Sequence, residues 1–303
     1  MSNNNDFWAQ EKVCDEQFLS GGPFYMISTE DLPWLLFESD DDFKEGTNLV
    51  AIAVAGLHLQ ILVDVIMNNH LHQVVEGPYD QALIFAEKLR KQMRAYLRRK
   101  GRTLKDWDIQ IKEITELKYL RNAILYVARN PYVAHRDATP LGYRWGSAHL
   151  LFNRNVSDYT QGILFKDLSF REKRELCHSH EIELPQVYRV SDGMILRQSF
   201  VSYKRAEEFF ISANQFFQWL SRKKESDVET AKWIGESILL PNDDVFRIVS
   251  DWFGVKSITT LTPDDRLQAA RRMKAELSSN NKQIAQVLRL PQRQIDLLFP
   301  LAQ

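Results

Sequence analysis

The segment from Ile61 to Glu76 restricts the fold of this chain more than any other. Two apolar runs meet at Asn68-Asn69, which predicts two strands joined by a tight turn. His70 and His72 open the second strand. Because side chains alternate across a strand, both imidazoles project from the same face. Two neighbouring imidazoles on a rigid strand make half of a metal site.

Helices and strands alternate around this pair up to about residue 150. The sequence patterns predict strands at 23–28 and 108–114, and helices at 40–57, 79–100 and 115–129, the last of which closes at Asn130-Pro131. This order predicts an α+β fold with one mainly antiparallel sheet and helices covering a face.

Beyond Arg154 helical periodicity dominates, with helices expected at 201–222, 228–240, 243–253 and 263–277. We therefore expect a loose polar lead-in at 1–22, an α+β domain at 23–153 and a mainly helical domain at 168–303. Within 278–299, two short helical stretches flank Leu290-Pro291, and this arrangement is typical of a helix-turn-helix. A pair of core helices that cap a bundle explains the same pattern equally well.

The composition is that of a soluble globular protein, with 44% hydrophobic and 26% charged residues. Cys14 and Cys177 suggest no disulfide framework and favour a reducing compartment. The polar first residues do not form a signal peptide, and the apolar stretch at 48–67 is too mixed to span a bilayer. We expect a cytoplasmic protein that does not bind membranes.

Two further features join the histidines. Tyr126 and Asn130 stand four residues apart in the last predicted helix of the first domain, so both face the same point. The 79–100 helix and the residues after it carry basic side chains without an acid among them, a pattern typical of phosphate binding. These side chains are Lys88, Arg90, Lys91, Arg94, Arg98, Arg99, Lys100 and Arg102.

Together these residues describe a phosphoryl-transfer site. His70, His72 and an amide oxygen would hold a divalent cation, Mg²⁺ or Mn²⁺, and Tyr126 would attack the phosphate to give a covalent phosphotyrosine. Each piece alone has an ordinary explanation, since a tyrosine in a helix is usually core and a basic run is usually a solvated face. Their occurrence in this order favours the catalytic interpretation.

At these positions the chain resembles the single-tyrosine transposases of the HUH endonuclease superfamily, especially the REP-associated branch. The motifs that carry the resemblance are Met67-Asn-Asn-His-Leu-His72, Tyr119-Leu120 and Tyr126-Val-Ala-Arg-Asn-Pro131. Tyr143-Arg-Trp-Gly-Ser147 is similar to a further family segment, with Gly at one position. The resemblance covers roughly residues 20–150.

The resemblance implies an RRM-like or ferredoxin-like antiparallel sheet, the HUH endonuclease fold, over 23–153. It implies that His70, His72 and Asn130 are metal ligands and that Tyr126 links to a DNA 5′-phosphate. The implied partner is single-stranded or hairpin DNA, which suggests a nucleoid-associated protein. The resemblance allows either a homodimer or a monomer.

Two other functions fit the same residues. An RRM-like sheet binds single strands without chemistry, so the chain is alternatively a non-catalytic nucleic-acid-binding protein. The third hypothesis is a metal-dependent hydrolase in which Tyr126 is only structural. Such an enzyme would cleave DNA without forming a covalent adduct.

Overall fold

The protein consists of two compact units. The computed structural model describes residues 4–29, 32, 35–104, 107–134, 139–157, 161–178, 184–221, 230, 233, 242–277, 279 and 281–299. The first unit comprises Met1–Pro131 and Ala138–Thr230, and the second comprises Tyr132–Asp137 and Ala231–Gln303. Among the described residues, no helix has the length and apolar character needed to cross a membrane.

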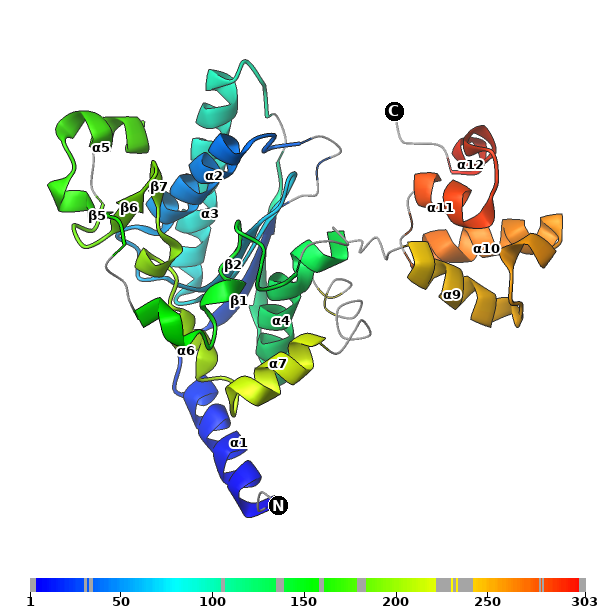
Figure 1. Ribbon diagram of the computed structural model, residues 1–303, viewed down its shortest axis with the longest axis horizontal. Helices are drawn as coiled ribbons and strands as arrows, with labels where there is room; N and C mark the ends of the chain where they lie inside the picture. Colours follow the sequence, from blue (N-terminus) through cyan, green and yellow to red (C-terminus); the bar gives the residue numbers. More distant parts are fainter. Residues whose placement is uncertain are drawn as a thin grey trace. The chain divides into compact units, whose positions relative to one another are not determined.

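A four-stranded antiparallel sheet forms the centre of the first unit (Figure 1). Its strands are β1 (Phe24–Thr29), β2 (Gln60–Ile66), β3 (Leu71–Glu76) and β4 (Ile109–Ile114), in the spatial order β2-β3-β1-β4. Helix α2 (Asp40–Val54) joins β1 to β2, and α3 (Tyr79–Arg99) joins β3 to β4. This β-α-β-β-α-β connectivity confirms the predicted α+β fold.

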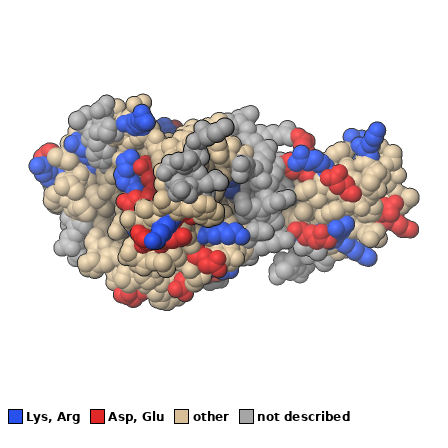
Figure 2. Space-filling model, turned by 90° about the horizontal axis from the view of Figure 1, so that it is seen from below, with Lys and Arg blue, Asp and Glu red and all other residues tan. Residues whose placement is uncertain are grey.

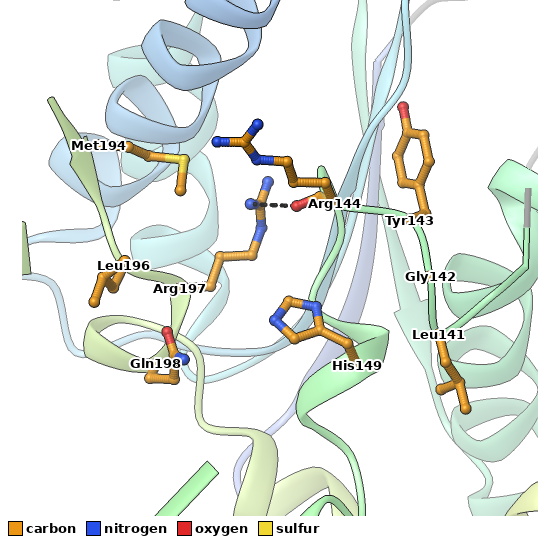
Figure 3. Close-up of a pocket in the computed structure, with 9 residues that line it drawn as sticks. All are labelled: Leu141, Gly142, Tyr143, Arg144, His149, Met194, Leu196, Arg197 and Gln198. Carbon is orange, nitrogen blue, oxygen red and sulfur yellow. Dashed lines mark hydrogen bonds between the residues drawn. The ribbon is translucent and has the colours of Figure 1, made fainter. Parts of the chain in front are cut away.

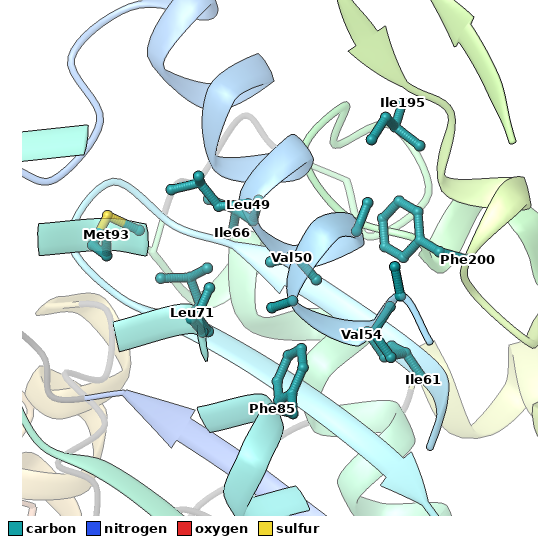
Figure 4. Close-up of a cluster of buried hydrophobic side chains, with 14 of the residues drawn as sticks. Leu49, Val50, Val54, Ile61, Ile66, Leu71, Phe85, Met93, Ile195 and Phe200 are labelled. Carbon is teal, nitrogen blue, oxygen red and sulfur yellow. The ribbon is translucent and has the colours of Figure 1, made fainter. Parts of the chain in front are cut away.

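Helices cover both faces of the sheet (Figure 1). Leu71 and Val75 of β3 belong to one core with Val50 of α2 and Phe85 of α3 (Figure 4). His72, which alternates with them, contacts helix α4 (Leu117–Ala134) instead. The sheet therefore has an α2–α3 face and an α4 face.

Two helix ends show how the sequence positions these elements. Helix α2 begins with a capping box in which Ser39 accepts a hydrogen bond from the Asp42 N–H and the Asp42 carboxylate accepts one from the Ser39 N–H. Helix α4 does not close at Asn130-Pro131 as predicted, because it passes through Pro131 and continues to Ala134. The buried packing of the residues up to Pro131, Tyr126 and Asn130 among them, offsets the hydrogen bond that a proline cannot make.

The expected loose lead-in at 1–22 is wrong, because Asn4–Leu19 form helix α1. Phe18 stacks on Phe24 of the sheet, with ring centroids 5.1 Å apart. Glu11 forms a bidentate ion pair with buried Arg121 of α4, at 2.5 and 2.9 Å. These tertiary contacts stabilise a helix that the polar local sequence does not reveal.

The expected domain boundary at 153–168 also requires correction, because residues 138–230 pack with the first unit. The segment around Gly146 pairs antiparallel with β2 at Val65, and Val201 bridges β2 at Ile61. The Ile66 N–H donates to the Trp145 carbonyl at 2.9 Å. The later chain thus covers the otherwise open edge of the sheet, where unpaired backbone groups are costly.

This later part of the first unit is not purely helical. It holds the short strands β5 (Ile163–Leu164), β6 (Arg189–Ser191) and β7 (Met194–Ile195), and the helices α5 (Phe170–Cys177), α6 (Tyr203–Glu207) and α7 (Ala213–Ser221). Short 3-10 helices lie at Ala148–Leu150, Arg154–Ser157, Phe165–Asp167 and Arg197–Ser199. The single helix predicted at 201–222 is broken because Val201 joins the sheet edge and Phe209 is buried between α6 and α7.

The second unit is helical, as predicted. Its described helices are α9 (Asn242–Phe253), α10 (Pro263–Glu276), α11 (Asn281–Leu288) and α12 (Gln292–Leu298), with a 3-10 helix at Ile258–Thr260. The helix predicted at 228–240 lies outside the described residues, apart from Thr230 and Trp233.

Candidate active site

Three aromatic side chains of the predicted site lie in a row on the α4 face. The ring centroids of His70 and His72 are 4.7 Å apart, and those of His72 and Tyr126 are 5.5 Å apart. Both pairs meet edge to face. The alternation of β3 and the position of Tyr126 on α4 therefore bring together residues more than fifty positions apart.

Burial sets the chemistry of this row. His72 is 0% exposed, Tyr126 3% and Asn130 8%, whereas His70 is partly exposed. Burial, reinforced by the neighbouring His70, lowers the pKa of His72 well below its usual value. The His72 ring is therefore neutral at pH 7, which is the form of imidazole that binds metals.

Hydrogen bonds fix the orientation of both imidazoles. The Asn69 Nδ2 donates to the Leu32 carbonyl at 2.6 Å, which leaves Asn69 Oδ1 facing the His70 Nδ1 at 2.9 Å. Because a carbonyl oxygen only accepts, His70 Nδ1 carries the proton and the neutral ring has its lone pair on Nε2. The His72 Nδ1 lies 3.1 Å from the Ser28 Oγ, so Ser28 holds the orientation of the second ring. Such outer partners are typical of metal-binding histidines.

Asn130 lies one helical turn beyond Tyr126 on α4. Since α4 continues past Pro131, Asn130 is held inside the helix and not in a fraying terminus. Within the part of the chain that the structure describes, no group of three or more His, Cys, Asp or Glu side chains is arranged to hold a metal ion. The predicted donor set is the two imidazoles with the Asn130 amide oxygen, and nitrogen and oxygen donors of these kinds are ligands that divalent cations accept.

The predicted basic residues lie on another part of the molecule. Helix α3 packs on the α2–α3 face, opposite His72 and Tyr126. Ion pairs join Arg90 to Glu87, Arg99 to Glu45, Lys100 to Asp42 and Arg102 to Glu38. On the face drawn in Figure 2, Lys and Arg side chains likewise lie beside Asp and Glu. The structure therefore does not bring the predicted phosphate-binding residues next to Tyr126.

The C-terminal end of α3 nevertheless reaches the same end of the sheet as His70. Arg102, just after the helix, donates a hydrogen bond to the Leu35 carbonyl. The next residue, Leu36, donates its N–H to the Asn68 carbonyl at 2.7 Å, directly before the histidine pair. Among the predicted basic residues, Arg102 is therefore linked to the turn before His70 by two hydrogen bonds, through Leu35 and Leu36.

A pocket opens at the covered edge of the sheet (Figure 3). It encloses about 360 Å³ and is lined by Leu141, Gly142, Tyr143, Arg144, His149, Met194, Leu196, Arg197 and Gln198. Val65 is paired with both Gly146 and His72, so this edge lies two strand spacings, about 10 Å, from the histidine row.

A buried ion pair anchors one wall of this pocket. The Arg197 Nε lies 3.1 Å from the Asp64 Oδ2, and both side chains are almost fully buried. Arg197 also donates to the Thr47 hydroxyl and to the Arg144 and Trp145 carbonyls, at 3.1, 3.3 and 2.9 Å. Arg197 thereby ties α2, β2 and the edge segment together.

Three residues that shape this region were not predicted as site residues, and the sequence offers a different amount of information about each. Asn69 is adjacent to His70, so its position beside the motif was a usable signal. Ser28 reaches His72 only through the pairing of β1 with β3, which no local pattern reveals. Arg197 lies 133 positions from Asp64, and the only hint is a charged residue in an apolar strand.

No family model matches the chain, and no curated protein does. Among solved structures, the chain is similar to a REP-associated tyrosine transposase bound to a REP hairpin. The identity is 16%, the TM-score is 0.37, and the match covers 45% of this chain and 81% of that chain.

Proposed function

We propose that the chain is a metal-dependent single-stranded DNA endonuclease and strand transferase, either a transposase or a domesticated copy of one. The fold in this proposal is of the HUH endonuclease type, with an RRM-like sheet. The observation that carries the proposal is the row formed by His70, His72 and Tyr126, with ring centroids 4.7 and 5.5 Å apart. A protein that only binds DNA has no need for this set.

In this proposal His70, His72 and the Asn130 amide oxygen hold Mg²⁺ or Mn²⁺. A cation held there would polarise the scissile phosphate and offset its charge. Asn69 and Ser28 contact the Nδ1 atoms of the two histidines, so each Nε2 is the nitrogen that would face the cation.

Tyr126 is the nucleophile of the proposed reaction. Its Oη loses its proton and forms a bond to phosphorus, and the bond from phosphorus to the 3′-oxygen breaks. The leaving 3′-oxygen takes up a proton and becomes a hydroxyl, so no proton is gained or lost overall. The product is a 5′-phosphotyrosine that conserves the energy of the broken bond, so a second 3′-hydroxyl can reverse the step elsewhere. Simple hydrolysis would not require this intermediate.

The test is covalent capture. The protein is incubated with Mn²⁺ and labelled single-stranded DNA that carries hairpins, and the products are separated on a denaturing gel. A labelled adduct that is lost in Tyr126→Phe supports the proposal. Tyr119→Phe is the matched control, because Tyr119 lies on the same helix but is partly exposed, and its adduct yield should equal that of the wild type.

The burial of Tyr126 and His72 limits the access of a DNA phosphate to the tyrosine. This observation is the reason to consider a second candidate, a single-stranded DNA-binding protein without catalysis. Binding to such DNA with no cleavage, unchanged in Tyr126→Phe, supports that candidate. Cleavage that persists in Tyr126→Phe identifies a hydrolase and contradicts the transferase mechanism.

A further inference from the structure

Helices α11 and α12 of the second unit take no part in the proposed reaction. Arg289, Leu290 and Pro291 separate them in a three-residue turn. Ile284 and Leu288 of α11 and Ile295 of α12 are fully buried in the unit. Two short helices joined by such a turn and packed through apolar residues form a helix-turn-helix.

The outer face of α12 carries three side chains that match the chemistry of base edges. Arg293 and Gln294 are exposed, and Leu297 is 77% exposed although it is a large apolar residue. Helical periodicity places the three on one arc of about 100°, away from Ile295, which is 1% exposed. Arginine pairs with guanine, glutamine with adenine, and an apolar side chain contacts the thymine methyl group in the major groove.

The acid on α12, Asp296, is exposed but is hydrogen-bonded to the start of α11. The buried Asn281 amide donates to the Asp296 Oδ1 at 3.0 Å and to the Phe299 carbonyl at 2.9 Å. These two bonds fix the angle of α12 to the start of α11. They also hold the carboxylate of Asp296 toward α11, which limits its repulsion of a DNA phosphate.

The turn itself contains a strained arginine. Arg289 has φ +53°, in the left-handed region where glycine is favoured and where a turn of this kind often has glycine. Its side chain is exposed, so packing does not explain the choice of residue. Strain kept at an exposed position points to a function of the side chain.

We propose that α11 and α12 bind duplex DNA, with α12 in the major groove and Arg289 on a phosphate. This activity goes beyond the proposed chemistry on single strands and does not depend on it. A duplex-binding unit would give the chain a second, sequence-specific contact with DNA that Tyr126 does not touch.

The sequence-reading part is tested by selection from labelled random 20-base-pair duplexes. Full-length Tyr126→Phe protein is used in EDTA at fixed salt, so neither cleavage nor a metal contributes. We expect one enriched sequence, and Arg293→Ala should bind it about 10- to 100-fold more weakly and lose preference at one guanine. Arg247→Ala is the matched control, because Arg247 is an exposed arginine on α9, and it should select the same sequence with unchanged affinity. No enriched sequence, or the same selection by Arg293→Ala, overturns the proposal.

The phosphate contact is tested by Arg289→Gly. Relief of the left-handed strain should raise the melting temperature of the protein. Loss of the phosphate contact should weaken binding to all duplexes alike and reduce the slope of log affinity against log salt by about one. Higher stability with unchanged affinity and slope shows that Arg289 contacts no phosphate and overturns this part of the proposal.

Discussion

At the scale of single residues, an amide determines which nitrogen of His70 can bind a metal. The bond from Asn69 Nδ2 to the Leu32 carbonyl prevents the Asn69 amide from turning over, so its oxygen always faces His70 Nδ1. Asn69 is therefore a positioning residue for the proposed cation site. It acts through His70 and touches no reacting atom.

We expect Asn69→Ala to raise the Mn²⁺ concentration needed for half-maximal adduct formation by about 10- to 100-fold, because outer-shell partners contribute this much to metal affinity. The measurement is a Mn²⁺ titration of the covalent-capture reaction. Asn68→Ala is the control, because Asn68 accepts hydrogen bonds from Leu36 and Phe37 through its backbone carbonyl, which the substitution keeps. An unchanged titration in Asn69→Ala would refute the positioning role.

Asp42 gives a residue-scale prediction about pH. Burial alone would raise its pKa, but hydrogen bonds from Lys100, Tyr96 and the Glu38 N–H lower the pKa far below its usual value. In the unfolded chain the carboxyl takes up a proton near pH 3.9, whereas in the folded protein it stays ionised. Its contribution to stability is therefore complete above about pH 4 and is lost as the pH falls toward the folded pKa.

We expect Asp42→Asn to reduce the free energy of unfolding at pH 7 by about 1–2 kcal/mol, the usual value of a helix-capping contact. Urea unfolding between pH 3 and pH 7 should also show a shallower acid slope than in the wild type. Asp41→Asn changes the neighbouring but exposed acid, so it should leave both quantities nearly unchanged. Equal acid slopes in wild type and Asp42→Asn would contradict the assignment.

At the scale of elements, the two faces of the sheet separate the roles of the helices. Helix α4 presents Tyr126 and Asn130 on the face of His72, and α3 presents its basic residues on the other. The amphipathic pattern of α3 correctly predicts a helix with a polar side. It cannot predict which face of the sheet that helix covers, because connection and packing decide this.

The Asp64–Arg197 ion pair joins strand β2 to the later chain, and its loss should change the free energy of unfolding. We expect Arg197→Met to lower the free energy of unfolding by about 3–5 kcal/mol, because the Asp64 carboxylate would stay buried without its partner. The combined change of Arg197→Met with Asp64→Leu should restore much of the loss, since a buried pair is often replaceable by apolar residues. Urea unfolding of the full chain measures both, and a loss below about 1 kcal/mol in the single variant would show that the pair is not important.

At the scale of the whole molecule, residues 138–230 complete the sheet unit. They supply the strand-like segment at Gly146, the bridge at Val201 and the guanidinium of Arg197. A chain that ends before them leaves the β2 edge open and Asp64 unpaired.

We therefore expect a chain of residues 1–230 to unfold cooperatively, with a melting temperature close to that of the first unit in the full protein. A chain of residues 1–153 should aggregate or melt without cooperativity. Circular dichroism melting and size-exclusion chromatography measure both, with the full chain as reference. Equal stability of the two shortened chains would mean that the boundary lies near 153 after all.

The local elements, and the side chains that share one face of an element, follow from the sequence alone. Alternation along a strand places His70 and His72 on one face, and the helical repeat places Asn130 beside Tyr126, because both periods are properties of the backbone. The order of strands and helices from β1 to α4 was predictable for the same reason, apart from the C-terminal end of α4. Helix α1, which precedes them, was not.

The contacts that join these elements depend on the tertiary structure. Helix α1 is stabilised by Arg121 and Phe24. The β2 edge is covered by Gly146 and Val201. Ser28 of β1 contacts His72 of the neighbouring strand β3. These contacts link residues that are far apart in the chain, and their energy comes from burial and hydrogen bonds that local propensity does not contain. The separation of the basic helix from Tyr126 has the same origin, since packing against the sheet sets where each helix lies.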